Sequence, residues 1–213
     1  MKLEVTDYPN SYLKIKMKIG ESIISEKGSF IISDGKFSAE NKLEFNSYKN
    51  LIAKIGGKSL SYVSYTAKED LELNLGTRDN SELTLLKIDA DRPILIKANC
   101  HFARTSGLEL ELIDKKLTKL IGGGFWMNVV GEGYLILKGY GKIIKKNIKS
   151  KSPMLIEEDA LIAFEKILDF KVIDTSLSDE VGQILKSGVE VPFSVKGQGS
   201  FWLQSKAKFS MDD

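Results

Sequence analysis

Apolar and polar residues alternate along many short stretches of this chain. Between Leu13 and Ile19 an apolar residue stands at every second position, with lysines between them. Leucines alternate with glutamates over Leu108–Leu112 in the same way. A period of two is typical of a β-strand that turns one face to the core and the other to water. The pattern therefore predicts many short strands.

Turn-forming residues separate these stretches, as at Ser33–Gly35 and Gly139–Gly141. Only Lys115–Leu120 and Asp179–Lys186 suggest helices, each of one or two turns. Many short strands with regular turns and little helix predict an all-β fold, an antiparallel β-sandwich or barrel. We expect one such domain over residues 1–213, because this length suits a single large core.

Glycines interrupt two runs of β-forming residues in the segment Gly122–Lys142. We predict a core hairpin there, because aromatic and β-branched residues favour a half-buried sheet and glycine permits tight turns and close approach of another strand. A second glycine pair precedes a tryptophan near the end of the chain. The residues predicted to carry this structural motif are Gly123, Gly124, Phe125, Trp126, Gly131, Gly133, Gly197, Gly199 and Trp202.

The chain also repeats itself. Pro93–Arg104 and Pro153–Phe164 begin alike and keep apolar residues at matching positions, and Glu21–Ile32 is a fainter third copy. Further on, Gly131–Leu137 matches Gly197–Leu203, and the corresponding part of the first unit keeps its alternating leucines but lacks the glycines. The pattern predicts pseudo-threefold repetition within one compact body. We place the repeats at about residues 10–80, 81–140 and 141–209.

Three segments, GGGFWMNVVGEGYLILKGYGKI, PMLIEEDALIAFE and VKGQGSFWLQS, together resemble the altered-inheritance-of-mitochondria, or mitochondrial biogenesis, family. The resemblance implies a fold similar to that of the tryptophan RNA-binding attenuation protein and related to the double-stranded β-helix. It also implies assembly into homo-oligomers, with a homotrimer as the expected size. It brings no catalytic residues, since the family's prokaryotic members have no established activity. The first repeat departs from the family pattern, because it keeps Gly56 and Gly57 but lacks the later glycine pair.

Acidic and basic side chains nearly balance, with 31 Lys and Arg against 29 Asp and Glu. This balance indicates neither a nucleic-acid binder nor a protein of the membrane surface. Met1–Tyr8 lacks the apolar core of a secretory signal, and the longest apolar stretch, Leu120–Val130, is too short to span a bilayer. The single cysteine, Cys100, excludes an internal disulfide. We therefore expect a cytoplasmic protein without membrane insertion.

Residues for catalysis or metal binding are scarce. A catalytic nucleophile needs a base and an orienting group, and the chain has one histidine, His101. His101 adjoins Cys100, and neighbouring side chains on a strand point to opposite faces. Zinc and iron sites need several Cys or His ligands, which only three copies of His101 at a trimer axis would provide. We predict a structural His101 and a protein that is not an enzyme and holds no cofactor or metal.

Two other motifs have functional and structural interpretations. The acidic run Glu157–Asp159 has the chemistry of an acid–base pair or a Ca²⁺ or Mg²⁺ site. It lies where we predict a hairpin turn, and the matching residues Lys97–Asn99 are not acidic. The pairs in Gly131–Gly133 and Gly197–Gly199 lead into strands, whereas phosphate-binding loops lead into helices. We interpret the acidic run as a solvated turn and the glycine pairs as turns or bulges.

One local charge pattern is compatible with a nucleic-acid partner. A stretch of fourteen residues contains six lysines and no acid, interleaved with Tyr140 and isoleucines. Such a basic stripe could follow a phosphate backbone, but lysines on an exposed edge strand also prevent aggregation, and we favour this second interpretation. The lysines are Lys138, Lys142, Lys145, Lys146, Lys149 and Lys151.

Two classes of function follow. In the first, the protein is a non-enzymatic oligomeric scaffold or assembly protein, whose core and oligomer interface come from Phe125, Trp126, Phe201, Trp202 and the alternating leucines. In the alternative, it is a binding module for nucleic acid or a small ligand, which uses the basic stripe or the mouth of a barrel.

Overall fold

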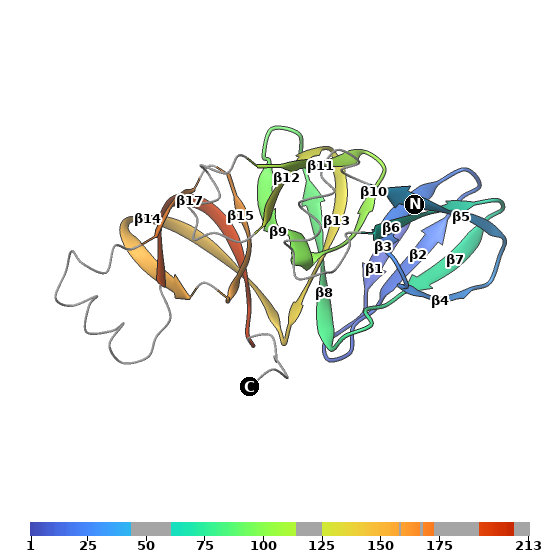
Figure 1. Ribbon diagram of the computed structural model, residues 1–213, viewed down its shortest axis with the longest axis horizontal. Helices are drawn as coiled ribbons and strands as arrows, with labels where there is room; N and C mark the ends of the chain where they lie inside the picture. Colours follow the sequence, from blue (N-terminus) through green and yellow to red (C-terminus); the bar gives the residue numbers. More distant parts are fainter. Residues whose placement is uncertain (44–60, 114–124, 158, 167, 173–191, 207–213) are drawn as a thin grey trace. The chain divides into compact units, whose positions relative to one another are not determined.

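A computed structural model describes residues 1–43, 61–113, 125–157, 159–166, 168–172 and 192–206 (Figure 1). These residues form β-strands, turns and one short 3₁₀ segment, Ala98–Cys100. The predicted all-β class is therefore confirmed. The helices predicted at Lys115–Leu120 and Asp179–Lys186 lie outside the described residues, as do Gly123 and Gly124 of the glycine motif.

The strands form three sheets, in each of which spatial neighbours are hydrogen-bonded. The first contains, in spatial order, β1 (Lys2–Val5), β2 (Leu13–Met17), β7 (Leu71–Leu75) and β4 (Phe30–Ser33). The second contains β5 (Phe37–Leu43), β6 (Ser61–Ala67), β3 (Ser22–Glu26), β10 (His101–Thr105), β13 (Gly133–Tyr140) and β8 (Ser81–Ile88). The third contains β11 (Leu108–Leu112), β12 (Trp126–Gly131), β9 (Ile94–Lys97), β15 (Leu161–Glu165), β17 (Pro192–Gln204) and β14 (Ile143–Glu157), and β16 (Asp169–Val172) also pairs with β17. As far as the chain is described, each sheet ends in two edge strands and does not close into a barrel.

The chain divides into two compact units, each with its own core. Unit 1 comprises Met1–Asp89, Cys100–Glu109 and Gly131–Lys138, and the remaining segments make up unit 2. In unit 1 the alternating apolar residues of β2 and β7 are buried, as their period of two predicts. The core of unit 2 is built by Leu95, Trp126, Ile148, Ile156, Leu161, Phe164, Leu168, Val195 and Phe201. A single domain over residues 1–213 stays a prediction.

The same irregular strand pairing occurs three times. β4 pairs with β7, β10 pairs with β13, and β15 pairs with β17, all antiparallel. Each pairing shifts register at one point, which is typical of a β-bulge. The shift falls between Phe30 and Ile32, between His101 and Ala103, and between Leu161 and Ala163. β4, β10 and β15 begin within the three similar segments found in the sequence, and their partners β7, β13 and β17 come later in the chain. The three pairs therefore share one local irregularity, and the pseudo-threefold repeat stays a prediction.

A second recurring pairing joins successive segments. Ser25 of β3 lies opposite Ala103 of β10, and Ile96 of β9 lies opposite Ala163 of β15. In both cases the strand that opens one segment, β3 or β9, pairs with the bulged strand of the following segment, β10 or β15. The paired residue of the bulged strand comes directly after the bulge. The first and second segments are thus each joined to the segment that follows by a strand pairing.

The hairpin predicted at Gly122–Lys142 is wrong. β12 lies in the third sheet, where it pairs with β9, and β13 lies in the second sheet, where it pairs with β10. Between them Gly131 has a φ of +101°, and a Cβ there would collide with the carbonyl oxygen of Gly107. The glycines therefore make a corner at which the chain leaves one sheet for another, and each strand finds its partner in an earlier part of the chain.

The hairpin predicted around Glu157–Asp159 is also wrong. β14 and β15 are not neighbours, because β17 lies between them and pairs with both. A turn is present at residues 159–160. The acidic run thus connects strands on the two edges of β17. Asp159 is exposed, and its Oδ1 atom lies 3.8 Å from Lys97 Nζ.

Candidate functional site

The edge strand β4 exposes three consecutive apolar side chains. Phe30, Ile31 and Ile32 are 46%, 53% and 57% exposed. β4 pairs with β7 on one side and is the last strand of its sheet (Figure 1). An exposed apolar edge strand presents unpaired backbone groups and is a typical site for pairing with another chain.

The corresponding strands of the other two segments are buried. In β10 the residues His101, Phe102 and Ala103 are at most 2% exposed. In β15, Leu161–Ala163 is fully buried. Among the strands that the structure describes, β10 and β15 each have a neighbour on both sides, whereas β4 has one only on the side of β7. This difference in neighbours accounts for the greater exposure of β4.

The end of β14 forms a second apolar edge. Its residues Met154–Glu157 pair with β17 on one side, and β14 is the last strand of the third sheet. Met154 and Leu155 are 42% and 47% exposed. The corresponding residues of β9, Ile94 and Leu95, are 2% exposed, because β15 pairs with that strand.

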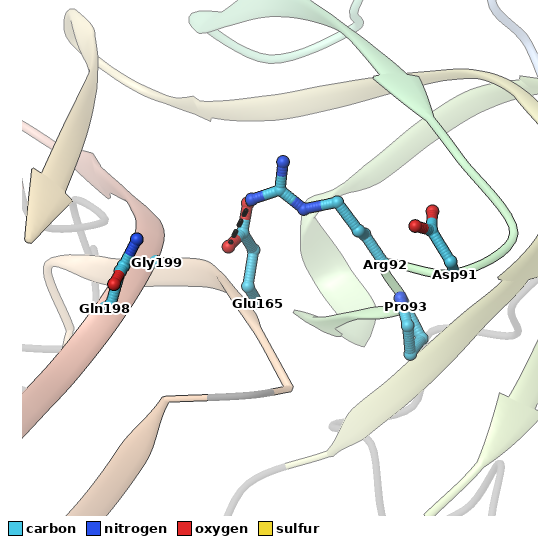
Figure 2. A pocket seen from close by; sticks show the side chains of 6 residues that line it. All are labelled: Asp91, Arg92, Pro93, Glu165, Gln198 and Gly199. Carbon is cyan, nitrogen blue, oxygen red and sulfur yellow. Dashed lines mark hydrogen bonds and ion pairs between the residues drawn. The ribbon is translucent and has the colours of Figure 1, made fainter.

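A pocket of about 380 Å³ lies in unit 2 and is lined by Asp91, Arg92, Pro93, Glu165, Gln198 and Gly199 (Figure 2). Its volume is within the range of small-ligand sites. Arg92 Nη2 donates to Glu165 Oε1 and Oε2, at 3.0 and 3.1 Å, and Figure 2 shows Asp91 on the other side of the Arg92 side chain. The described lining offers polar contacts and contains no Ser, Thr, Cys, Lys or His side chain.

Gly199 leaves the space that this ion pair needs. A Cβ on Gly199 would lie 2.9 Å from Glu165 Oε2 and 3.1 Å from Leu168. Gly197, nearby on β17, has a φ of +116° and lies opposite Ser150, where the pairing of β14 with β17 shifts register. The glycine pair near the end of the chain thus accompanies a bulge.

The only histidine of the chain is enclosed in unit 1. His101 is 2% exposed, its Nε2 atom is 3.5 Å from Arg104 Nη1, and its ring meets that of Tyr62 edge to face. Burial, reinforced by the positive charge of Lys138, lowers the pKa of His101 to about 3. A neutral imidazole without access to solvent cannot act as a general base. Its burial also prevents three copies from meeting at an oligomer axis to bind a metal.

Burial also affects the neighbours of His101. It raises the pKa of the Tyr62 hydroxyl well above its ordinary value and lowers the pKa of Arg104 to about 10. Arg104 Nε donates to the carbonyl oxygen of Leu108, and its guanidinium lies over the Tyr62 ring. All these groups keep their ordinary charge state near neutral pH. The contacts of the cluster join β6, β10 and β11.

The predicted basic stripe is divided in the structure. Lys138 Nζ lies 2.6 Å from Glu26 Oε2, and its side chain is only 12% exposed, so it is already neutralised. On β14, Lys145 lies opposite Trp202, and Lys146 lies opposite Phe201. Adjacent side chains on a strand point to opposite faces, so Lys145 and Lys146 cannot contact one phosphate backbone together.

The other lysines give the stripe limited support. Lys142 and Lys149 are exposed, and the side chain of Lys151 lies outside the described residues. Lys145 Nζ lies 5.3 Å from the centre of the Trp202 ring. All of these except Lys142 belong to an edge strand. Nucleic-acid contact through this stretch stays a prediction.

The aromatic part of the glycine motif lies in the core of unit 2. Trp126 and Trp202 are 2% and 7% exposed, and the Trp126 ring meets that of Phe164 at 5.3 Å. Phe125 is half-buried, and its carbonyl oxygen accepts a hydrogen bond from the Ala98 N–H group. These contacts join β12 to the segment that contains β9. Their role in an oligomer interface stays a prediction.

Fold and site together describe an all-β protein with three equivalent strand pairs and two apolar sheet edges. Within the described ranges, no three His, Cys, Asp or Glu side chains are grouped as metal ligands would be. None of the described helical segments has the length and apolar character needed to cross a bilayer. The chain belongs to the Mitochondrial biogenesis AIM24 family, whose family model matches residues 3–206.

The comparison with solved structures supports the fold. The X-ray crystal structure of protein SPYM3_0169 from Streptococcus pyogenes superimposes with a TM-score of 0.70, covering 97% of this chain and 94% of that one. The two sequences are 18% identical, so the similarity shows the fold alone. No curated protein matches the chain. The family predicted from the sequence is confirmed, and the likeness to the tryptophan RNA-binding attenuation protein stays a prediction.

Proposed function

We propose that this chain is a non-enzymatic scaffold or interaction protein that assembles with copies of itself in the cytoplasm. The observation that carries the proposal is the apolar edge of β4. Phe30, Ile31 and Ile32 are about half exposed, although the equivalent strands of the same chain are buried. Covering such side chains removes apolar surface from water, which is the main driving force of protein association.

The non-enzymatic part of the proposal rests on the chemistry of the candidate residues. The chain has one histidine and one cysteine. His101 is buried and neutral, and Glu165 is engaged by Arg92. The homotrimer expected from the family resemblance is part of the proposal, and it requires an interface that repeats around a closed ring.

Native mass spectrometry and light scattering test the proposal on the full chain. We expect a mass that is a whole multiple of 23.7 kDa, with three copies as the expected number. Ile32→Lys should shift the population to monomer, because it places a charge in the apolar edge. A wild-type chain that stays monomeric at micromolar concentration would rule out self-assembly.

Ile19→Lys is the matched control. Ile19 is an isoleucine of the same unit, 69% exposed, that lies outside β4. The control substitution should leave the mass unchanged. Loss of the oligomer in both variants would show that the effect of Ile32→Lys is not specific to the edge of β4.

A further inference from the structure

We propose that the edge of β4 binds the strand Met154–Glu157 of a second copy of the chain. The inference rests on the self-assembly proposed above and specifies the two surfaces that meet. Both strands stand at the end of a sheet, and both expose apolar side chains. Pairing them would extend the first sheet of one copy by a strand of the other.

The three equivalent segments share one arrangement of strands. Each has a first strand, namely β3, β9 or Met154–Glu157, and a second strand, namely β4, β10 or β15. The first strand always pairs on one side with a strand that comes later in its own repeat, as β3 with β6, β9 with β12, and Met154–Glu157 with β17. Its other side accepts the second strand of the following segment.

Within the described residues this second contact occurs twice, and one further first strand and one further second strand are not engaged in it. β3 pairs with β10, and β9 pairs with β15. Among the described residues, the first strand Met154–Glu157 pairs only with β17, and the second strand β4 pairs only with β7. The two unused edges are therefore the two halves of one recurring interface, which a second copy completes without altering any pairing within the chain.

The exposed fractions of the side chains on both edges support this assignment. Ile94 and Leu95 are 2% exposed under β15, whereas Met154 and Leu155, at the same places, are 42% and 47% exposed. Phe102 and Ala103 of β10 are fully buried beside β3, whereas the corresponding strand β4 is about half exposed. Five of the large apolar side chains exposed in the described residues thus belong to these two edges. They are Phe30, Ile31, Ile32, Met154 and Leu155.

The recurring interface also fixes the register. Ser25 lies opposite Ala103, and Ile96 lies opposite Ala163, where each alanine directly follows the bulge of its strand. Ile32 holds this place in β4, and Ile156 corresponds to Ile96. The proposed antiparallel pairing therefore sets Ile156 of one copy opposite Ile32 of the other. By the same count, Leu155 lies opposite Ser33.

The interface is heterologous, because different surfaces of the two copies meet. Such an interface leaves one free edge at each end of a dimer and is satisfied throughout only when copies close into a ring. A ring of three copies agrees with the trimer proposed above. The main-chain hydrogen bonds of an added strand would supply the affinity, and the apolar side chains would select the partner.

Disulfide trapping tests the register in the full chain. Directly opposed residues of antiparallel strands have Cβ atoms close enough for a disulfide. We expect the Ser33→Cys, Leu155→Cys double variant to form disulfide-linked multimers on mild oxidation, and each single variant to form none. Mixing ¹⁴N- and ¹⁵N-labelled chains before oxidation should give mixed-isotope peptides joined through positions 33 and 155. The wild type, in which Cys100 is buried, shows how much disulfide-linked product forms without the introduced cysteines.

A pair two residues out of register is the matched control. Ser33→Cys with Glu157→Cys should give no product above the single-cysteine background, because the two Cβ atoms would be too far apart. Equal yields from the two pairs would overturn the register. A disulfide formed only within one chain would overturn the choice of a second copy.

Hydrogen exchange tests the proposed strand pairing independently, in the wild-type protein and without any substitution. Amides of Phe30–Ser33 and Met154–Glu157 should exchange more slowly in concentrated than in dilute solution. Unchanged exchange together with a multimeric mass would overturn this inference but leave self-assembly standing. Unchanged exchange together with a monomeric mass would overturn both proposals.

Discussion

The rings of His101 and Tyr62 meet edge to face, with centroids 4.9 Å apart, in a part of unit 1 that excludes solvent. Within the described residues, neither His101 Nδ1 nor the Tyr62 hydroxyl has a hydrogen-bond partner. The pair is stable only while the imidazole is neutral, because a buried charge there would lack compensation.

Acid should therefore destabilise the protein through His101. The pKa of His101 is about 3 in the folded chain and 6.5 when unfolded, so between these values only the unfolded state binds the proton. The free energy of unfolding should fall as the pH decreases below 6.5, approaching about 1.4 kcal/mol per pH unit. Urea unfolding at pH 7 and pH 5 measures this slope before the carboxylates titrate.

His101→Leu is the control for this prediction, because Leu161 holds the corresponding place in β15. The variant should lose most of the dependence on pH between 6.5 and 5, since the chain has no other histidine. An equal slope in the wild type and the variant would contradict the assignment.

The two tryptophans of unit 2 should each contribute a similar amount to the free energy of unfolding. Trp126→Ala or Trp202→Ala removes a buried indole and should lower the free energy of unfolding by about 3 to 5 kcal/mol. Chemical denaturation measures the loss. Tyr8→Ala, at a residue that is 53% exposed, should change stability little. A melting temperature that is unchanged in either tryptophan variant would remove that residue from the core.

The corner at Gly131 should tolerate no side chain. Gly131 and Gly20 both have a positive φ, of +101° and +82°, but a Cβ on Gly131 would collide with the Gly107 carbonyl whereas one on Gly20 meets nothing within 4 Å. Gly20→Ala should cost about 1 kcal/mol from backbone strain. Gly131→Ala should cost clearly more in thermal unfolding. Equal effects would show that backbone strain alone limits this position.

The lysines of β14 should preserve solubility. Replacing Lys145 and Lys149 by Val should increase turbidity, because charged side chains on an edge strand discourage pairing between sheets. Lys166→Val, at an exposed residue outside the strands, should have no such effect. A salt-sensitive gel shift of RNA by the wild type, lost in the Lys145→Glu, Lys146→Glu variant, would instead support nucleic-acid binding.

The local patterns of the sequence predicted many of the strands of this fold. They did not predict which strands pair with each other. The alternation at Leu13–Ile19 predicted β2, and the similarity of Pro93–Arg104 to Pro153–Phe164 identified segments that share a bulge. The hairpins failed because a strand's partner depends on the whole chain, so that β12 and β13 pair with β9 and β10, which come earlier in the same repeat, and not with each other. Sequence alone gives little indication of such distant pairings.

The candidate site was harder to predict, because Phe30–Ser33 has the composition of a buried strand. Its apolar run resembles those of β10 and β15, which are buried. Only the order of strands in the sheets reveals that, among the described strands, β4 has a neighbour on one side alone. The pocket beside Arg92 was also missed, since Asp91, Glu165 and Gln198 are far apart in the sequence.

The register shift between Phe30 and Ile32 also affects which strands β4 can accept. A straight apolar edge would recruit almost any extended peptide and could seed fibrils. A bulge bends and twists its strand, so a straight peptide cannot follow β4 along its whole length. If β4 pairs with a second copy as proposed, this irregularity would favour a strand shaped to fit it over the straight segments of unfolded proteins.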